Sequence, residues 1–174
     1  MSAGDIRVAS GGYGTRTIDT DDRDTSGQIQ TLYGNPVKRG GTGSNFAVPV
    51  QDGEPENGTD VMIGIVNRTD TSTATVNGVV EVLLTGPGTI LEGDASTSAN
   101  IDTASELLGL MLDFVAFDVS ATSVWTIDED QNFQATQGNV GLNIVGGDII
   151  RTRVFVSVNA CTLFGSVRNP IQTA

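Results

Sequence analysis

The stretch "VMIGIVNRTDTSTATVNGVVEVLLT", residues 61–85, decides the fold class of this chain. It begins with "VMIGIVNR", which is apolar nearly throughout and is typical of a buried strand. Asn77-Gly78 then separates two β-prone runs, and an Asn-Gly pair readily takes the positive φ angles of a type I′ turn. The stretch therefore predicts a β fold that contains a hairpin.

One helix is expected after this stretch, in "NIDTASELLGLMLD" at residues 100–113. Thr103 and Glu106 match a T-x-x-E capping box, in which a side-chain acceptor and a reciprocal carboxylate satisfy the first turn. The apolar residues that follow are expected to form the core-facing side of the helix. They are Leu107, Leu108, Leu110, Met111 and Leu112.

The rest of the chain beyond residue 44 has the composition of strands and turns. Strands are expected at residues 114–119, 123–127, 140–145 and 149–158, with Gly146-Gly147 as the turn before the last one. Glycine contributes 22 residues, while charged residues make up only 17% of the chain. The predicted fold class is mainly β: a small β-barrel-like or β-sandwich-like domain with one short capped helix and an extended N-terminal arm.

The N-terminal segment differs from this β domain. Its apolar residues are sparse, and polar runs such as "DTDDRDTSG" (19–27) separate them. Such a segment buries too little surface to compensate for the entropy of ordering its backbone. We therefore expect an extended arm and junction over residues 1–43, attached to a β domain over residues 44–174. The arm would be ordered on a partner, although a purely flexible tail is an alternative.

Charge restricts the partners. The 174-residue chain has a net charge of −12 and no histidine, and the negative charge falls on the part after residue 39. Such a body repels nucleic acid and anionic membrane surfaces, so neither is expected as a partner. A single cysteine allows no intrachain disulfide, and no membrane span or signal peptide is recognisable. We expect a soluble protein made in a cytoplasm.

No catalytic signature is recognisable. Without histidine, the Ser-His-Asp and Cys-His nucleophile systems and the common zinc sites cannot be built. Paired carboxylates could hydrolyse a glycoside, but the sequence marks no pair as buried. "DEDQN" at residues 128–132 begins like a calcium loop, but Phe133 occupies the required glycine position, so a solvated turn is the preferred interpretation. We expect no enzyme activity, no cofactor and no metal, with calcium left open.

Four segments together resemble the capsid decoration, or cement, proteins of tailed bacteriophages. They are "GNPVKRG" (34–40), "VMIGIVNRTDTSTATVNGVVEVLLTGPGT" (61–89), "NIDTASELLGLMLDFVAFD" (100–118) and "GLNIVGGDIIRTRVFVSVN" (141–159). In that family a "G-x-PV" turn leads into the first strands of a small β-barrel-like domain. The likeness covers roughly residues 34–159 and consists of turn and strand patterns.

The resemblance implies a structural protein of the virion. Such a protein is made in the host cytoplasm, forms a homotrimer on the outer capsid surface, and stabilises the shell by bridging neighbouring subunits of the major capsid protein. The arm would carry the capsid contacts, through Ile6, Arg7, Val8, Tyr13, Arg16, Ile18, Arg23, Ile29, Leu32 and Tyr33. Lys38 and Arg39, at the junction, would meet acidic groups of the capsid or of a neighbouring protomer, or would lie in a plain solvated turn.

Two other classes of protein fit the same composition. One is a different phage structural or adhesion module, such as a head fibre, tail-tube or receptor-binding β domain, for which an exposed aromatic platform is expected. The other is a carbohydrate-active enzyme, which requires two facing carboxylates in a deep cleft.

Overall fold

The computed structural model describes residues 6–20, 34–39, 47–54, 62–68, 78–119, 124–129 and 142–158. Within these ranges the chain forms strands in two sheets, together with one α-helix and one 3-10 helix. The prediction of a mainly β fold with one short capped helix is confirmed.

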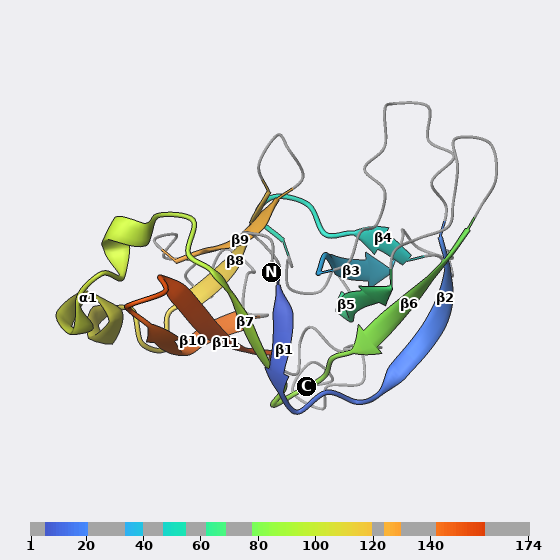
Figure 1. The fold of residues 1–174 in the computed structure, drawn as a ribbon, viewed down its shortest axis with the longest axis horizontal. Coiled ribbons are helices and arrows are strands. Elements are labelled where there is room, and N and C mark those ends of the chain that lie inside the picture. Colours follow the sequence, from blue (N-terminus) through green and yellow to red (C-terminus); the bar gives the residue numbers. More distant parts are fainter. Residues whose placement is uncertain are drawn as a thin grey trace, which may run out of the picture.

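Sheet A carries the helical elements at one end. Its described strands lie in the order β1 (Arg7–Ser10), β7 (Ile90–Asp94), β11 (Arg153–Val158), β10 (Leu142–Asp148), β8 (Phe114–Val119) and β9 (Trp125–Asp128). Neighbouring strands pair antiparallel. The short helix η1 (Ser98–Asn100) and helix α1 (Ala104–Gly109) connect β7 to β8, and α1 lies at the far end of this sheet (Figure 1).

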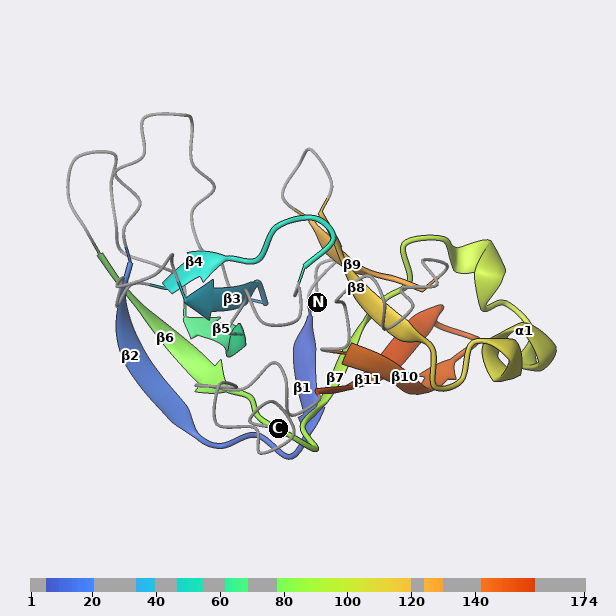
Figure 2. The ribbon, with the colours of Figure 1, turned by 180° about the vertical axis from the view of Figure 1, so that it is seen from behind.

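Sheet B lies beside sheet A and receives the chain from β1 (Figure 2). Its described strands lie in the order β4 (Ala47–Pro49), β3 (Pro36–Arg39), β5 (Met62–Arg68), β6 (Gly78–Leu84) and β2 (Thr15–Thr20). These neighbours pair antiparallel, and a single parallel bridge between Thr20 and Ala47 joins the outermost strands, β2 and β4.

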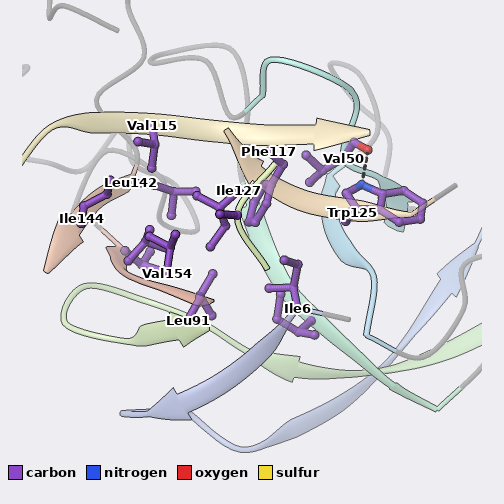
Figure 3. Packing of buried hydrophobic residues seen from close by; sticks show 14 of the residues in the cluster. Ile6, Val50, Leu91, Val115, Phe117, Trp125, Ile127, Leu142, Ile144 and Val154 are labelled. Atoms are coloured by element: carbon purple, nitrogen blue, oxygen red, sulfur yellow. Dashed lines mark hydrogen bonds between the residues drawn. The ribbon is translucent and has the colours of Figure 1, made fainter. Parts of the chain in front are cut away.

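The larger hydrophobic cluster covers one face of sheet A (Figure 3). Trp125 and Phe117 are its largest side chains, and both are buried. The Trp125 indole Nε1 donates a hydrogen bond to the Val50 carbonyl at 3.0 Å, which satisfies its one polar group inside the core. Val50 follows β4, so this bond ties the end of a sheet B strand to the sheet A core.

Strand β5 connects the two hydrophobic clusters of the described chain. Met62 and Ile65 belong to the larger cluster, while Ile63 and Val66 belong to a second cluster inside sheet B. Both faces of the strand are therefore buried, which explains why its sequence is apolar nearly throughout rather than alternating. The prediction of a buried strand here is confirmed.

Helix α1 begins as its sequence predicts. Thr103 accepts a hydrogen bond from the Glu106 backbone N–H at 3.3 Å, and Glu106 Oε2 accepts one from the Thr103 N–H at 3.0 Å. This reciprocal pair is the predicted capping box. The helix ends at Gly109. Of the apolar residues predicted to form its core-facing side, only Leu107 and Leu108 therefore lie within the helix.

The two predicted turns differ in outcome. Gly78 begins β6 and pairs with Thr20, so it is a strand residue, whereas Asn77 and the rest of residues 69–77 lie outside the described part. Gly146 and Gly147 lie within β10, and the turn follows at residues 149–152. There Asp148 Oδ1 accepts hydrogen bonds from the backbone N–H groups of Ile150 (3.0 Å) and Arg151 (3.2 Å), which favours the turn at this later position.

The prediction of an N-terminal arm outside the β domain is wrong for residues 6–20 and 34–39. Strand β1 pairs with β7, and β2 pairs with β6 along its whole length. Strand β3 pairs with β4 across the predicted boundary at residues 43 and 44. Backbone pairing and the buried side chains of Ile6 and Val37 hold this segment in place without an apolar-rich sequence. Residues 1–5, 21–33 and 40–43 lie outside the described residues.

Candidate interaction surface

The apolar residues proposed to clamp a capsid face the protein's own interior where they are described. Ile6 is only 1% exposed and belongs to the larger hydrophobic cluster, against which Val8 also packs. Ile18 packs against the second cluster. Ile6 is therefore enclosed in the protein's own core, which corrects its assignment as a capsid contact, whereas Val8 and Ile18 are only partly buried.

The remaining predicted contacts are divided between the surface and the undescribed segments. Tyr13 is 61% exposed, and its hydroxyl donates a hydrogen bond to the Pro87 carbonyl at 3.0 Å. Arg16 is exposed on β2, a sheet B strand. Arg23, Ile29, Leu32 and Tyr33 lie outside the described residues, so their predicted role is neither supported nor contradicted.

Lys38 is directed toward its own chain. Its ammonium group forms an ion pair with the Glu54 carboxylate, and both side chains are largely buried. Glu54 Oε2 also accepts a hydrogen bond from the Gln51 backbone N–H at 2.6 Å. Lys38 therefore has a carboxylate partner in its own chain, and its contact with a capsid or neighbouring protomer stays a prediction. The Arg39 backbone pairs with Ala47 in the β3–β4 ladder, and its side chain lies outside the described part.

An ion-pair network that the sequence did not indicate crosses three strands of sheet A. Arg7 on β1 donates to both oxygens of Glu92 on β7, with Nε–Oε2 at 2.8 Å and Nη2–Oε1 at 2.5 Å. Arg153 on β11 brings Nε to 2.8 Å from Glu92 Oε1 and Nη1 to 3.2 Å from Asp94 Oδ1. The Arg153 Nε lies off the hydrogen-bond direction, so this close contact is an ion pair without a hydrogen bond.

This ion-pair network has a structural role, because it joins strands of sheet A to one another. The Arg153 and Glu92 side chains are each only 9% exposed, and two cations are balanced there by two carboxylates. Buried charges of this kind are tolerated only when they are paired. The network fastens β1 to sheet A, and register alone brings Arg7 opposite Glu92.

Glu129 is a second buried carboxylate, and it lies in the segment interpreted from sequence as a solvated turn. It is only 1% exposed. Its oxygens accept hydrogen bonds from the backbone N–H groups of Ser96 (2.8 Å) and Thr97 (3.0 Å) and from the Asn100 amide (3.2 Å). Glu129 therefore holds the start of η1 against the end of β9, and the solvated-turn interpretation is wrong at this residue. Residues 130–132 lie outside the described part.

Asp118 on β8 interacts with Asp52, which lies in the loop after β4. Partial burial of Asp118 raises its pKa, and the charge and hydrogen bond of Asp52 raise it further, whereas a hydrogen bond with Thr126 opposes the shift. The two carboxyl groups are hydrogen-bonded, whereas those of glycosidases lie roughly 5–9.5 Å apart. This pair therefore lacks the spacing for glycoside hydrolysis. No group of three or more Asp, Glu, Cys or His residues suited to a metal occurs among the described residues.

The apolar side of α1 is only partly buried. Leu107, Leu110 and Met111 pack against the larger cluster, as predicted. Leu108 and Leu112 are 72% and 69% exposed, so the prediction that they face the core is wrong. Because the helix ends at Gly109, Leu112 does not continue its face but lies in the turn that follows.

Leu112 is also in an unfavourable backbone conformation. Its φ is +73°, in the left-handed region, where a leucine costs about 1–2 kcal/mol relative to the right-handed form. Glycine or asparagine is the usual residue at such a position after a helix. Its backbone N–H donates to the Ile144 carbonyl at 2.9 Å, which fixes it beside β10. Leucine at this position therefore combines a strained backbone with an exposed apolar side chain.

The β10–β11 turn adds two more exposed apolar side chains at the same end of the molecule. Ile149 is 37% exposed and Ile150 is 91% exposed. Leu107 of α1 lies against Gly147, where an added Cβ would come within 2.9 Å of the Leu107 Cδ1, so the helix and this turn are adjacent. Figure 1 shows both at the far end of sheet A. We call Leu108, Leu112, Ile149 and Ile150 the end surface.

Acidic groups lie in the segments that carry the end surface. Asp102 and Glu106 are exposed at the start of α1, Asp113 follows Leu112, and Asp148 precedes Ile149. A hydrogen bond and the charge of Glu106 raise the pKa of Asp102, and the Thr103 hydroxyl lowers the pKa of Glu106. Arg151 is the one basic residue in these two segments, and its Nε lies 3.7 Å from Asp148 Oδ2. The end surface therefore combines exposed apolar side chains with more acidic than basic groups in the same two adjacent segments.

Comparison with protein-family models, with curated proteins and with solved structures gives no match. None of the helices in the described residues has the length and apolar character needed to cross a membrane.

Proposed function

We propose that this chain is a structural virion protein that decorates the outer surface of a tailed-bacteriophage capsid. It would stabilise the shell by bridging neighbouring subunits of the major capsid protein, without enzyme activity. This partner class comes from the sequence resemblance, and the geometry of one turn supports it.

The supporting observation is the turn at Gly34. Its φ is +84°, which glycine adopts easily. Its backbone N–H donates to the Val66 carbonyl at 3.0 Å, and its carbonyl accepts from the Ile6 N–H at 3.1 Å. Pro36 then begins β3, and Val37 is fully buried. The "G-x-PV" segment thus leads through a turn into a core strand, as it does in the family that the sequence resembles.

Two finer features belong to the same proposal. The five strands of sheet B, linked through the Thr20–Ala47 bridge, would form the small barrel of such proteins. The protein would act as a homotrimer on the shell. Binding only to assembled subunits shifts the equilibrium toward the intact particle, because the binding free energy is absent from the dissociated state. The net charge of −12 suits the outside of the shell, away from packaged DNA.

Cosedimentation tests the proposal. Shells are assembled from the major capsid protein of the same virus without this chain, and the purified protein is added in increasing amounts. Saturable binding and a higher disruption temperature of the decorated shells are expected. Failure to sediment with the shells at any concentration, or binding without added stability, would exclude decoration.

A further inference from the structure

The end surface has properties that the stability of the isolated fold does not explain. Four of the six large apolar side chains that are well exposed in the described chain gather there. Leu112 keeps its position despite a left-handed backbone that glycine would adopt without strain. Strained residues of this kind persist where the surrounding structure holds them, and they concentrate at functional sites. An exposed apolar patch with a polar rim is typical of a protein–protein interaction site.

Charge identifies the chemistry of the partner. Asp102, Glu106, Asp113 and Asp148 lie in the two segments that carry the end surface, and Arg151 is the one basic residue there. A second copy of this chain docked through the same surface would bring two sets of acidic groups together, which is unfavourable. An anionic membrane is disfavoured for the same reason. A complementary surface has apolar side chains at its centre and lysine or arginine at its edge.

We propose that the end surface is the docking site for a partner protein that presents apolar side chains flanked by lysine or arginine. Leu108 and Ile150 are its outermost anchors, and Leu112 lies between the helix and β10. The inference rests on the proposed function only for the partner's identity, which would then be a capsid subunit. The docking chemistry can be tested without any capsid.

The direct test uses two synthetic amphipathic peptides as probes. One alternates leucine and lysine at helical spacing, and the other has glutamate in place of every lysine. Fluorescence anisotropy should show the full-length protein binding the lysine peptide at least about tenfold more tightly than the glutamate peptide. The double variant Leu108→Ser/Ile150→Ser should lose at least about tenfold in affinity for the lysine peptide.

Two further variants distinguish docking at the end surface from nonspecific binding to exposed apolar side chains and from unfolding. Val79→Ser removes an exposed apolar side chain on β6, away from the end surface, and should leave the affinity unchanged. Leu112→Gly should keep or raise the melting temperature while it lowers peptide affinity, because glycine relieves the positive φ but removes a contact. A purely structural Leu112 would lose stability and keep affinity.

Each result decides a separate question. Equal affinity of the wild type and the Leu108→Ser/Ile150→Ser variant for the lysine peptide would overturn the docking site. A change of oligomeric state in that variant, measured by sedimentation, would also overturn it, because the surface would then join copies of this chain. If the wild type binds the lysine peptide as expected but fails to bind shells, the proposed decoration function falls and the docking site stands.

Discussion

Arg7 and Glu92 face each other across β1 and β7, and the guanidinium group donates two hydrogen bonds to the carboxylate. This contact spans 85 residues of sequence and is completed by Arg153. A bidentate arginine–carboxylate pair is among the strongest polar contacts in proteins. It makes the first described strand part of sheet A, and several measurable consequences depend on it.

Replacing Glu92 with glutamine removes the carboxylate that Arg153 and Arg7 share, so the buried Arg153 keeps its ion pair with Asp94 but loses the one with Glu92, and the Arg7 contact is weakened. Removal of one partner of a buried pair typically costs 3–5 kcal/mol, and partial exposure of Arg7 places the expected loss near about 3 kcal/mol. Urea unfolding measures this loss. The matched variant Glu81→Gln, which alters an exposed hydrogen bond from Asn67, should cost less than about 1 kcal/mol. Equal effects of the two variants would show that the network adds no stability.

The isoleucines at 6 and 150 form a matched pair for testing whether the N-terminal segment belongs to the fold. Ile6→Ala should lower the free energy of unfolding by about 2–4 kcal/mol, because Ile6 is fully enclosed in the larger cluster. Ile150→Ala should change it by less than about 0.5 kcal/mol, because that side chain is 91% exposed. Deleting residues 1–33, which removes both β1 and β2, should abolish cooperative thermal unfolding. An unchanged thermal transition after this deletion would restore the idea of a separate arm.

Substitution of Gly64 tests how closely β5 approaches β6, and substitution of Gly109 in α1 is the control. A Cβ on Gly64 would lie 2.1 Å from the Leu83 carbonyl oxygen, so Gly64→Ala should destabilise the protein by about 2 kcal/mol or more. A Cβ on Gly109 would meet nothing within 4 Å, and alanine is the better helix former. Gly109→Ala should therefore stabilise by up to about 1 kcal/mol. Thermal denaturation should show that the melting temperatures of the two variants move in opposite directions. Shifts of both melting temperatures in the same direction would contradict this packing.

Asp118 predicts a pH dependence of stability. Because its pKa is raised in the folded state, its favourable contribution is complete below the ordinary aspartate pKa of 3.8 and is lost as the pH rises through the raised value. Asp118→Asn should therefore be more stable than the wild type at pH 7, by less than about 1 kcal/mol because the group is only partly buried and solvent screens its charge. The difference should vanish below pH 3.8. Asp52→Asn should give a smaller gain, because burial is the larger cause of the raised pKa of Asp118 and this variant leaves it in place. A difference in stability between Asp118→Asn and the wild type that does not change with pH would contradict a raised pKa of Asp118 in the folded state.

The elements that could be predicted from sequence are those whose signals are local. The Thr103–Glu106 capping box involves residues three apart, and the apolar run of β5 reports burial on both faces directly. Strand β1 gave no such signal, because its place depends on Glu92 and on a core that other strands build around Ile6. The end surface was missed for a related reason. Helical spacing predicted that Leu108 and Leu112 face the core, but both are exposed. The helix ends at Gly109, so the helical spacing does not extend as far as Leu112.

The strand order of sheet A also has a consequence for synthesis on the ribosome. Strand β1 has β7 as its paired neighbour among the described strands, and β7 in turn pairs with β11 at Arg153–Val158. The N-terminal strand leaves the exit tunnel early, but it cannot complete its sheet until residue 158 has been made. Pairings this distant are slow to form, because the loop between the partners must close first. We therefore expect nascent chains stalled before β11 to remain sensitive to protease, and resistance to appear only when β11 has emerged.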